Sequence, residues 1–283
     1  MEQASAAKEK ILVFEPHPDD VAFQLSGSVA RWLSLGIEVM VCTITTGNNS
    51  NFDINISSGE IERVMAEEHR RAMGLLGLDD GHALMWRYND LGLDPGRDRL
   101  PLLKDMVRLI RKYRPVTVVT MDPKNRDNEE NADHRLAAMT GFEAAAVAAY
   151  PNVFREQFDE EGVTPHFSAR VLHYMSPEPD YFVDIAGEFI GKKIELGLIY
   201  GSQLELMLTE ARERLAVMGL RSDLFELPPE VIWPEMCREI AAESVALHNR
   251  RYPDRPPMEH AEAFRLQYLG VVDKLRGLIP GLE

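Results

Sequence analysis

The stretch ILVFEPHPDDVAFQLSG, residues 11–27, joins a hydrophobic run of strand length to an amphipathic run of helical length. Between the two runs lie His17, Asp19 and Asp20. The prolines that flank His17 fix two backbone φ angles and bias the residues before them towards extended conformation, which makes the turn rigid. In an open α/β sheet, ligands bind at the carboxyl ends of the strands. The stretch therefore predicts a strand, a rigid polar turn and a helix, with a functional site at the turn.

Hydrophobic and amphipathic segments alternate along the first two thirds of the chain. Runs of strand length, rich in β-branched or aromatic residues, occupy 11–14, 38–44, 83–88, 116–121 and 170–175. Helical patterns occupy 20–34, 58–77, 101–113 and 134–149. Strands that alternate with helices pair in parallel through right-handed crossovers. The sequence therefore predicts an α/β protein with three layers, α/β/α, and a mainly parallel sheet.

The last third of the chain has a different pattern. Residues 186–215 are predicted as one long helix, and residues 236–249 and 259–277 as two more. No Gly/Ser-rich linker marks a boundary between this part and the rest. We therefore expect one domain over 1–283, with a core at about 9–185 and a helical C-terminal extension at about 186–283 that packs on the sheet or makes subunit contacts.

Charge and composition limit the classes of partner. The formal net charge of −15 argues against non-specific binding to nucleic acid or to an anionic membrane, because both require clustered cations. No run of about 18 apolar residues is present, which predicts no membrane span. The first ten residues, MEQASAAKEK, lack the apolar core of a signal peptide. We expect a cytoplasmic protein that binds a small molecule.

The turn after the first predicted strand carries groups that bind metals and move protons. His17 and Asp20 are three residues apart, so a strand-to-helix turn can direct both side chains at one point. An imidazole and a carboxylate suit Zn²⁺ or a similar divalent ion. Asp19, between them, is placed as a general base for a metal-activated water. The competing interpretation is that the acids cap the helix and the histidine lies on the surface.

A third candidate ligand follows a later strand. The strand at 116–121 runs into a polar loop, and Asp133 and His134 stand at the start of the next helix. This repeats the order of the first site: strand, polar turn, acid and histidine, helix. A nucleotide-binding α/β protein is the alternative from another enzyme class. It is disfavoured because the first turn holds prolines and acids where such folds need glycines for close approach of phosphate.

Taken together, these segments resemble the PIG-L/LmbE-like zinc-dependent N-deacetylases, a family of N-acetylglucosaminyl deacetylases. The resemblance covers most of the chain in the right order. It is carried by HPDD (17–20), TTG (45–47), a Glu-rich helix that ends in LLGL (75–78), DP (122–123) with ADHR (132–135), VDIAGEFIGKKIELGLIYGSQ (183–203) and HAEAFR (260–265).

The resemblance implies a role for each matching residue. His17 and Asp20 match the first two zinc ligands, His134 matches the third, and Asp19 matches the general base. It also implies a Rossmann-like sheet, a Zn²⁺ cofactor (another divalent metal being possible) and assembly into homo-oligomers, as trimers or hexamers. The implied reaction is hydrolysis of the acetamide of an N-acetylglucosamine-type substrate, which releases acetate and a free amino sugar.

Four further residues are expected near the substrate. Asn131 stands where the family has a histidine that stabilises the oxyanion, and its amide donates a hydrogen bond but carries no charge. Asp90 is expected to bind sugar hydroxyls. Arg63 is the nearest match, out of register, for a substrate-contacting arginine. His260 is a candidate to reach a neighbouring subunit's site.

Two alternatives remain open within this family, and one further histidine is judged unimportant. Because Asn131 replaces a histidine, the chain is alternatively a metal-binding member with weak activity or with activity on a non-sugar amide or conjugate. A non-catalytic metal-binding or assembly protein is the third hypothesis. His69 is expected on the polar face of its helix, with no role in the site.

Overall fold

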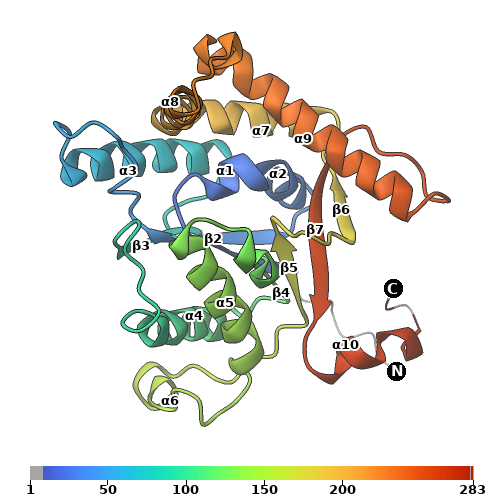
Figure 1. Cartoon of the computed structure of the whole chain (residues 1–283). Coiled ribbons are helices and arrows are strands. Elements are labelled where there is room, and N and C mark those ends of the chain that lie inside the picture. Colours follow the sequence, from blue (N-terminus) through green and yellow to red (C-terminus); the bar gives the residue numbers. More distant parts are fainter. Residues whose placement is uncertain (1–8, 281, 283) are drawn as a thin grey trace.

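The computed structural model describes residues 9–280 and 282, and its centre is a seven-stranded sheet (Figure 1). The strands are β1 (Lys10–Glu15), β2 (Glu38–Thr45), β3 (Ala83–Tyr88), β4 (Thr117–Met121), β5 (Arg170–Tyr174), β6 (Tyr181–Asp184) and β7 (Ala261–Tyr268). Their order across the sheet is β3-β2-β1-β4-β5-β7-β6. Strands β1 to β5 pair in parallel, and β7 runs antiparallel to both of its neighbours. The predicted, mainly parallel sheet is confirmed.

Helices cover both faces of this sheet, which gives the predicted three layers. They are α1 (Asp20–Gln24), α2 (Ser26–Ser34), α3 (Ser58–Leu75), α4 (Arg99–Tyr113), α5 (Ala132–Val147), α6 (Glu156–Glu161), α7 (Glu188–Ile199), α8 (Gly201–Val217), α9 (Pro229–Arg251) and α10 (Val271–Leu275), with 3₁₀ turns η1 (Pro123–Asp127), η2 (Asp223–Glu226) and η3 (Arg276–Leu278). In Figure 1, α1, α2, α3, α7 and α9 lie above the sheet, and α4 and α5 lie below it.

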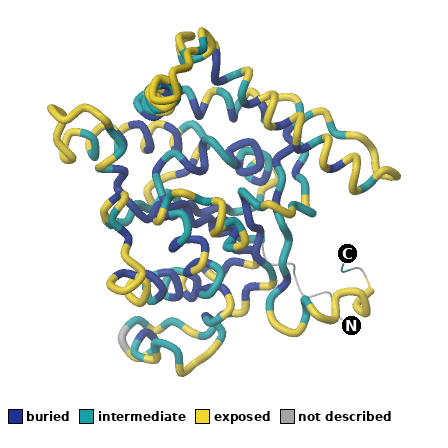
Figure 2. Tube along the Cα trace, viewed as in Figure 1, coloured by how far each residue is buried: buried dark blue, intermediate teal, exposed yellow. Residues whose placement is uncertain are grey.

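Each face of the sheet has its own hydrophobic core. One core packs Val13 and Val41 against Trp32 of α2, Leu196 of α7 and Trp233 of α9. The second packs strand residues of the opposite face against α4 and α5. Alternate residues of a strand point to opposite faces, so β1 supplies both cores and is buried along almost its whole length. Figure 2 shows this buried centre inside an exposed outer layer.

The prediction from the sequence is wrong for one strand and for two helix breaks, and it misses a second strand. Residues 259–277, predicted as a helix, form β7 and the short α10, because pairing with β5 and β6 on both sides overrides the helix-forming residues of AEAFRLQY. The predicted single helix 186–215 is two helices that meet at Tyr200, and the helix predicted at 20–34 breaks at Leu25. The four-residue strand β6 was not predicted at all. The last third therefore adds strand as well as helices to the structure.

A buried ion pair ties β7 to the helical layer. Glu262 accepts from Lys193 Nζ at 2.7 Å, and the two side chains are only 5% and 2% exposed. The same carboxylate accepts from the backbone amides of Gly27 and Ser28 at 3.3 and 2.7 Å. The Glu262 carboxylate thus connects β7 to α7 and to the start of α2. Helix α2 comes shortly after the turn that contains His17, Asp19 and Asp20. No described helix is long and apolar enough to cross a membrane.

The Lys193→Met variant is expected to lose stability, because it leaves the Glu262 carboxylate buried without its cation. Breaking a buried pair by removing one partner costs about 3–5 kcal/mol. Urea unfolding measures the loss. Lys192→Met is the matched control, since Lys192 is 38% exposed and faces Glu195 at 3.2 Å, where a pair contributes little. Equal losses in the two variants would contradict a special role for the buried pair.

Candidate metal centre and active site

The turn that follows β1 is closed by its own hydrogen bonds. The backbone N–H of His17 donates to Asp20 Oδ2 at 2.8 Å, so the carboxylate holds the turn while facing the histidine ring. Below the turn, the Pro18 carbonyl accepts from the Tyr200 hydroxyl at 2.5 Å. The break between α7 and α8 at Tyr200 thus places a hydroxyl under the candidate site.

A buried polar group supports the same turn from within the protein. Glu15 is fully buried, and it accepts from Val21 N at 2.7 Å and from Thr43 Oγ1 at 2.5 Å. His69 Nδ1 lies 3.1 Å from both the Pro18 carbonyl and the Tyr200 hydroxyl. Burial raises the pKa of Glu15 well above its usual value and lowers the pKa of His69 to about 4. Burial thus disfavours the charged forms of both side chains.

The position predicted for His69 is wrong. The side chain is buried, on the same face of α3 as Met65, Ala72 and Met73. The spacing of these residues, four before His69 and three and four after it, is that of one helix face, and it was the sequence signal available.

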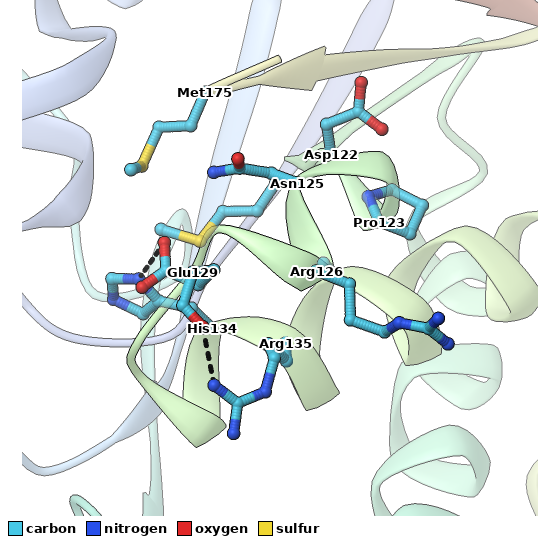
Figure 3. Close-up of a pocket in the computed structure, with 10 residues that line it drawn as sticks. Asp122, Pro123, Asn125, Arg126, Glu129, His134, Arg135 and Met175 are labelled. Atoms are coloured by element: carbon cyan, nitrogen blue, oxygen red, sulfur yellow. Dashed lines mark hydrogen bonds and ion pairs between the residues drawn. The ribbon is translucent and has the colours of Figure 1, made fainter. Parts of the chain in front are cut away.

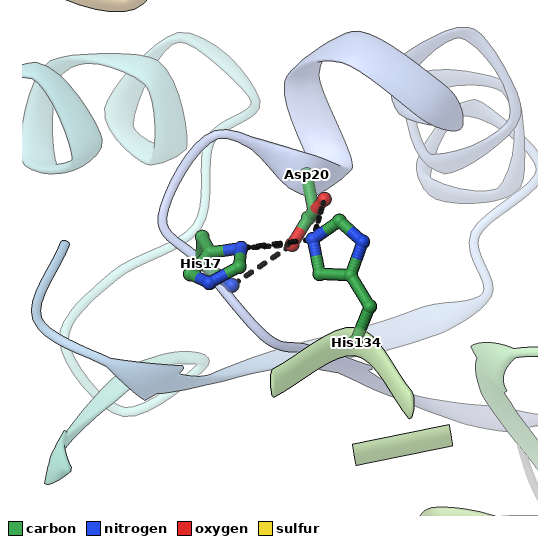
Figure 4. A group of neighbouring side chains, drawn as sticks. All are labelled: His17, Asp20 and His134. Atoms are coloured by element: carbon green, nitrogen blue, oxygen red, sulfur yellow. Dashed lines mark hydrogen bonds and ion pairs between the residues drawn. The ribbon is translucent and has the colours of Figure 1, made fainter. Parts of the chain in front are cut away.

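Three candidate ligands converge above the turn, as Figure 4 shows. His17 Nδ1 lies 2.9 Å from His134 Nε2 and 3.4 Å from Asp20 Oδ2. His134 Nε2 lies 3.6 Å from Asp20 Oδ1. Their ligand atoms all fall within 4.8 Å of one another. Tetrahedral zinc with ligands at about 2.0–2.2 Å would separate the ligand atoms by roughly 3.3 Å. Two imidazole nitrogens and a carboxylate at these separations fit such an ion.

The ring nitrogens that point away from this cluster face carboxylates. His17 Nε2 lies 3.2 Å from Asp90 Oδ1 and 3.5 Å from Asp133 Oδ2. His134 Nδ1 lies 3.2 Å from Glu129 Oε2. A carboxylate behind a histidine ligand fixes its ring and its tautomer. No sequence pattern indicates these contacts for Glu129 or Asp133, because they depend on how the loop before α5 and the start of α5 fold against the turn after β1.

The electrostatics of the cluster favour positive charge. Burial opposes ionisation of His17, but Asp133, Asp20 and Asp90 raise its pKa well above its usual value. Burial likewise opposes the charged form of Asp20, yet the two histidines lower the pKa of this carboxyl group. A site that stabilises cationic imidazole in this way is suited to a bound cation.

Asp19 is the acidic residue of the turn at the N-terminal end of α1, and its side chain does not cap the helix. It occupies the N-cap position of α1, but its side chain makes no capping hydrogen bond. Burial, together with the neighbouring Asp20 carboxylate, raises the pKa of Asp19 to about 7. The capping interpretation of the sequence therefore does not account for this side chain.

Asn131 has a structural task at the start of α5. It is the N-cap residue, and its Oδ1 accepts from the backbone N–H of Asp133 at 2.8 Å. This bond uses the oxygen of the carboxamide and leaves the NH₂ group as the donor.

The three remaining predicted residues lie in different settings. Asp90 is buried, and its Oδ2 accepts from Asn49 N at 3.2 Å while Oδ1 faces His17, so its carboxylate is already engaged. Arg63 is exposed on α3 and donates to the Gly59 carbonyl at 3.3 Å. His260 directly precedes β7, where its carbonyl accepts from Ile185 N. Among the described residues, Arg63 and His260 form no hydrogen bond or ion pair with the three candidate ligands.

A small hollow lies beside His134 (Figure 3). Its lining combines polar side chains of η1 and the following loop with Met121, Ala138 and Met175. Asn125, Arg126 and Glu129 contribute the polar part. The hollow lies on the Glu129 side of the His134 ring.

Solved structures share this fold. The structure of N,N'-diacetylchitobiose deacetylase from Pyrococcus horikoshii superposes with a TM-score of 0.73 and 24% identity, covering 92% of this chain and 84% of that one. A 4-carboxy-2-hydroxymuconate hydratase from Pseudomonas putida superposes with a TM-score of 0.65 and 18% identity, covering 91% of this chain and 95% of that one. At these identities the likeness establishes the fold, and the fold is common to proteins with different reactions.

Sequence comparison is more specific. A diacetylchitobiose deacetylase from Thermococcus kodakarensis is 35% identical over 178 residues, which cover 63% of this chain and 64% of that protein. The match thus spans just under two thirds of the relative's length. A family model described as PIG-L, GlcNAc-PI de-N-acetylase, matches residues 12–145, the segment that contains His17, Asp20 and His134. The N-terminal half of the chain is therefore similar to the PIG-L family over the segment that carries the three candidate ligands.

Proposed function

We propose that this protein is a zinc-dependent N-deacetylase that hydrolyses the acetamide of an N-acetylglucosamine-type substrate to acetate and a free amino sugar. The observation that carries the proposal is the convergence of His17, Asp20 and His134, with Asp19 next to Asp20 in the same turn. The match to the PIG-L family model and the similarity to a diacetylchitobiose deacetylase support the choice of reaction and substrate class.

The residues divide the chemistry between them. His17, Asp20 and His134 would hold zinc, which when bound acts as a Lewis acid on the amide carbonyl and makes water nucleophilic near neutral pH. Asp19 accepts a proton from the attacking water and returns it to the departing amine. One C–O bond forms and the C–N bond breaks. Asp90 and Asp133 orient His17, so we assign Asp90 to ring orientation first and to sugar hydroxyls second.

The remaining parts of the proposal rest on the resemblance alone. They are substrate contact by Arg63, a contribution of His260 to a neighbouring subunit's site, and assembly into trimers or hexamers; a cytoplasmic location is proposed from the composition of the sequence. Light scattering coupled to size-exclusion chromatography tests the assembly, and a monomer at working concentration would contradict it.

Acetate release tests the reaction directly. The metal-loaded protein is incubated with N-acetylglucosamine, N,N'-diacetylchitobiose and a non-sugar acetamide such as an N-acetylated amino acid. We expect acetate from one or both sugars and little from the non-sugar amide. Acetate from the non-sugar amide alone would favour the alternative, a family member with a different amidase activity, which the replacement of histidine by Asn131 supports. No acetate from any substrate would contradict the deacetylase proposal.

Two variants separate the roles of Asn131. Asn131→Asp keeps an oxygen that caps α5 but loses the NH₂ donor, whereas Asn131→Ala loses both, at a cost of about 1 kcal/mol in stability. If the NH₂ group stabilises the oxyanion, Asn131→Asp should unfold like the unmodified protein and yet lose about 10²–10³-fold in kcat. An Asp variant with unchanged kcat would limit Asn131 to capping the helix.

A further inference from the structure

We infer that Glu129 is a positioning residue for His134, which fixes the imidazole ring so that Nε2 faces His17 and Asp20. The inference rests on the proposed metal site. Glu129 lies in the loop between η1 and α5, five residues before His134 and two before the N-cap residue. Figure 3 shows its carboxylate directed at the imidazole.

The two oxygens of the Glu129 carboxylate have separate partners. Oε2 lies 3.2 Å from His134 Nδ1, and the two side chains are only 14% and 15% exposed. Oε1 accepts from the backbone N–H of Asn131 at 3.0 Å. One carboxylate therefore connects the start of α5 to a ring on the first turn of the same helix.

The backbone that carries Glu129 is itself held in place. The Arg135 guanidinium donates to the carbonyl of Glu129 at 2.6 Å and to that of Glu130 at 2.9 Å. Arg135 directly follows His134 in α5. The helix therefore fixes the loop through Arg135, and the loop positions the imidazole ring of His134 through Glu129. The carboxylate thus has a fixed position from which to orient the imidazole.

A histidine ligand needs such a partner because the proton of a neutral imidazole can lie on either nitrogen, and the contact made by one nitrogen decides which of them carries it. A carboxylate beside Nδ1 keeps the proton there and leaves the Nε2 lone pair for a cation. Among the described residues, Glu129 is the only acidic side chain within 4 Å of Nδ1 of His134. His17 has the matching arrangement, with Asp90 and Asp133 behind its own outer nitrogen.

The neighbouring Glu130 provides a matched control. Its side chain is 88% exposed and lies 3.7 Å from Arg214, away from the imidazole. It has the same charge, lies in the same loop and bonds to Arg135 through the same kind of carbonyl contact. Replacing Glu130 therefore repeats the loss of charge and side chain without removing the contact to His134.

The test measures metal affinity rather than turnover. Zn²⁺ affinity is determined by competition with a chromogenic chelator for the unmodified protein and for Glu129→Ala, Glu129→Gln and Glu130→Ala, and each is loaded with Co²⁺ to record its visible spectrum. We expect Glu129→Ala to bind Zn²⁺ about 10–100-fold more weakly and to shift the Co²⁺ bands. Glu129→Gln should also bind Zn²⁺ more weakly, because it carries no charge and its single carboxamide oxygen can face either Asn131 N–H or His134 Nδ1 but not both. Glu130→Ala should match the unmodified protein.

Unchanged Zn²⁺ affinity and an unchanged Co²⁺ spectrum in the Glu129 variants would overturn the inference. If Glu129→Ala does not fold, Glu129→Gln decides, since its oxygen can keep the bond to Asn131 N–H. An unmodified protein that binds Zn²⁺ but releases no acetate would defeat the proposed deacetylase activity and leave the affinity comparison valid. An unmodified protein that binds no divalent cation would overturn the positioning role as well as the metal site.

Discussion

Asp19→Asn is expected to keep its metal and to lose about 10²–10⁴-fold in kcat, the usual contribution of a positioned general base. The Asp19 side chain makes no capping hydrogen bond, so the substitution removes no cap from helix α1. Asparagine has nearly the same shape but cannot accept the proton of the attacking water. Metal content per chain and kcat for acetate release are measured on the same sample.

Asp127→Asn is the control for this change. Asp127 lies in η1 and is 84% exposed, so the same substitution there should leave kcat unchanged. Turnover that survives in Asp19→Asn would remove Asp19 as the base. Loss of metal together with turnover would instead make Asp19 part of the metal site.

His134→Ala is expected to lose the metal itself. The substitution removes one of three ligand side chains, so the loss of affinity should exceed the about 10–100-fold that is typical of outer contacts such as Glu129. Metal content after dialysis against a chelator measures the effect, and acetate release should fall with it. His82→Ala is the matched control, because His82 is 38% exposed and pairs with Asp79 at the surface. A His134→Ala protein that retains one metal per chain would contradict the proposed ligand set.

The sequence predicted the architecture wherever local pattern and tertiary environment agree. Strands β1, β2, β4 and β5 are buried between two helical layers, and their hydrophobic runs are therefore clear in the sequence. The pattern failed at β7, whose residues favour helix and which becomes a strand only because β5 and β6 supply partners far away in sequence. It also failed at Tyr200, where a helix break serves a contact with Pro18.

The grouping of the three candidate ligands was predictable for a topological reason. β1 and β4 are parallel neighbours in the sheet, so their carboxyl ends lie side by side. The turn with His17 and Asp20 follows β1, and the helix that starts near His134 follows β4, so the two meet at this end of the strands. The contacts behind the rings could not be predicted. Asp90 was expected at the site only as a ligand of sugar hydroxyls, and Glu129 reaches the site through an irregular loop with no periodic pattern. The roles of all these residues remain proposals that the variants above test.

Removal and return of the metal tests the central claim most directly. Acetate release from N,N'-diacetylchitobiose is measured for protein stripped by a chelator and then titrated with Zn²⁺. The account predicts no release from the stripped protein and recovery that levels off at one Zn²⁺ per chain, because both groups of candidate ligands among the described residues contain His17. Acetate release that is unaffected by stripping, or absent at every Zn²⁺ concentration, would contradict it.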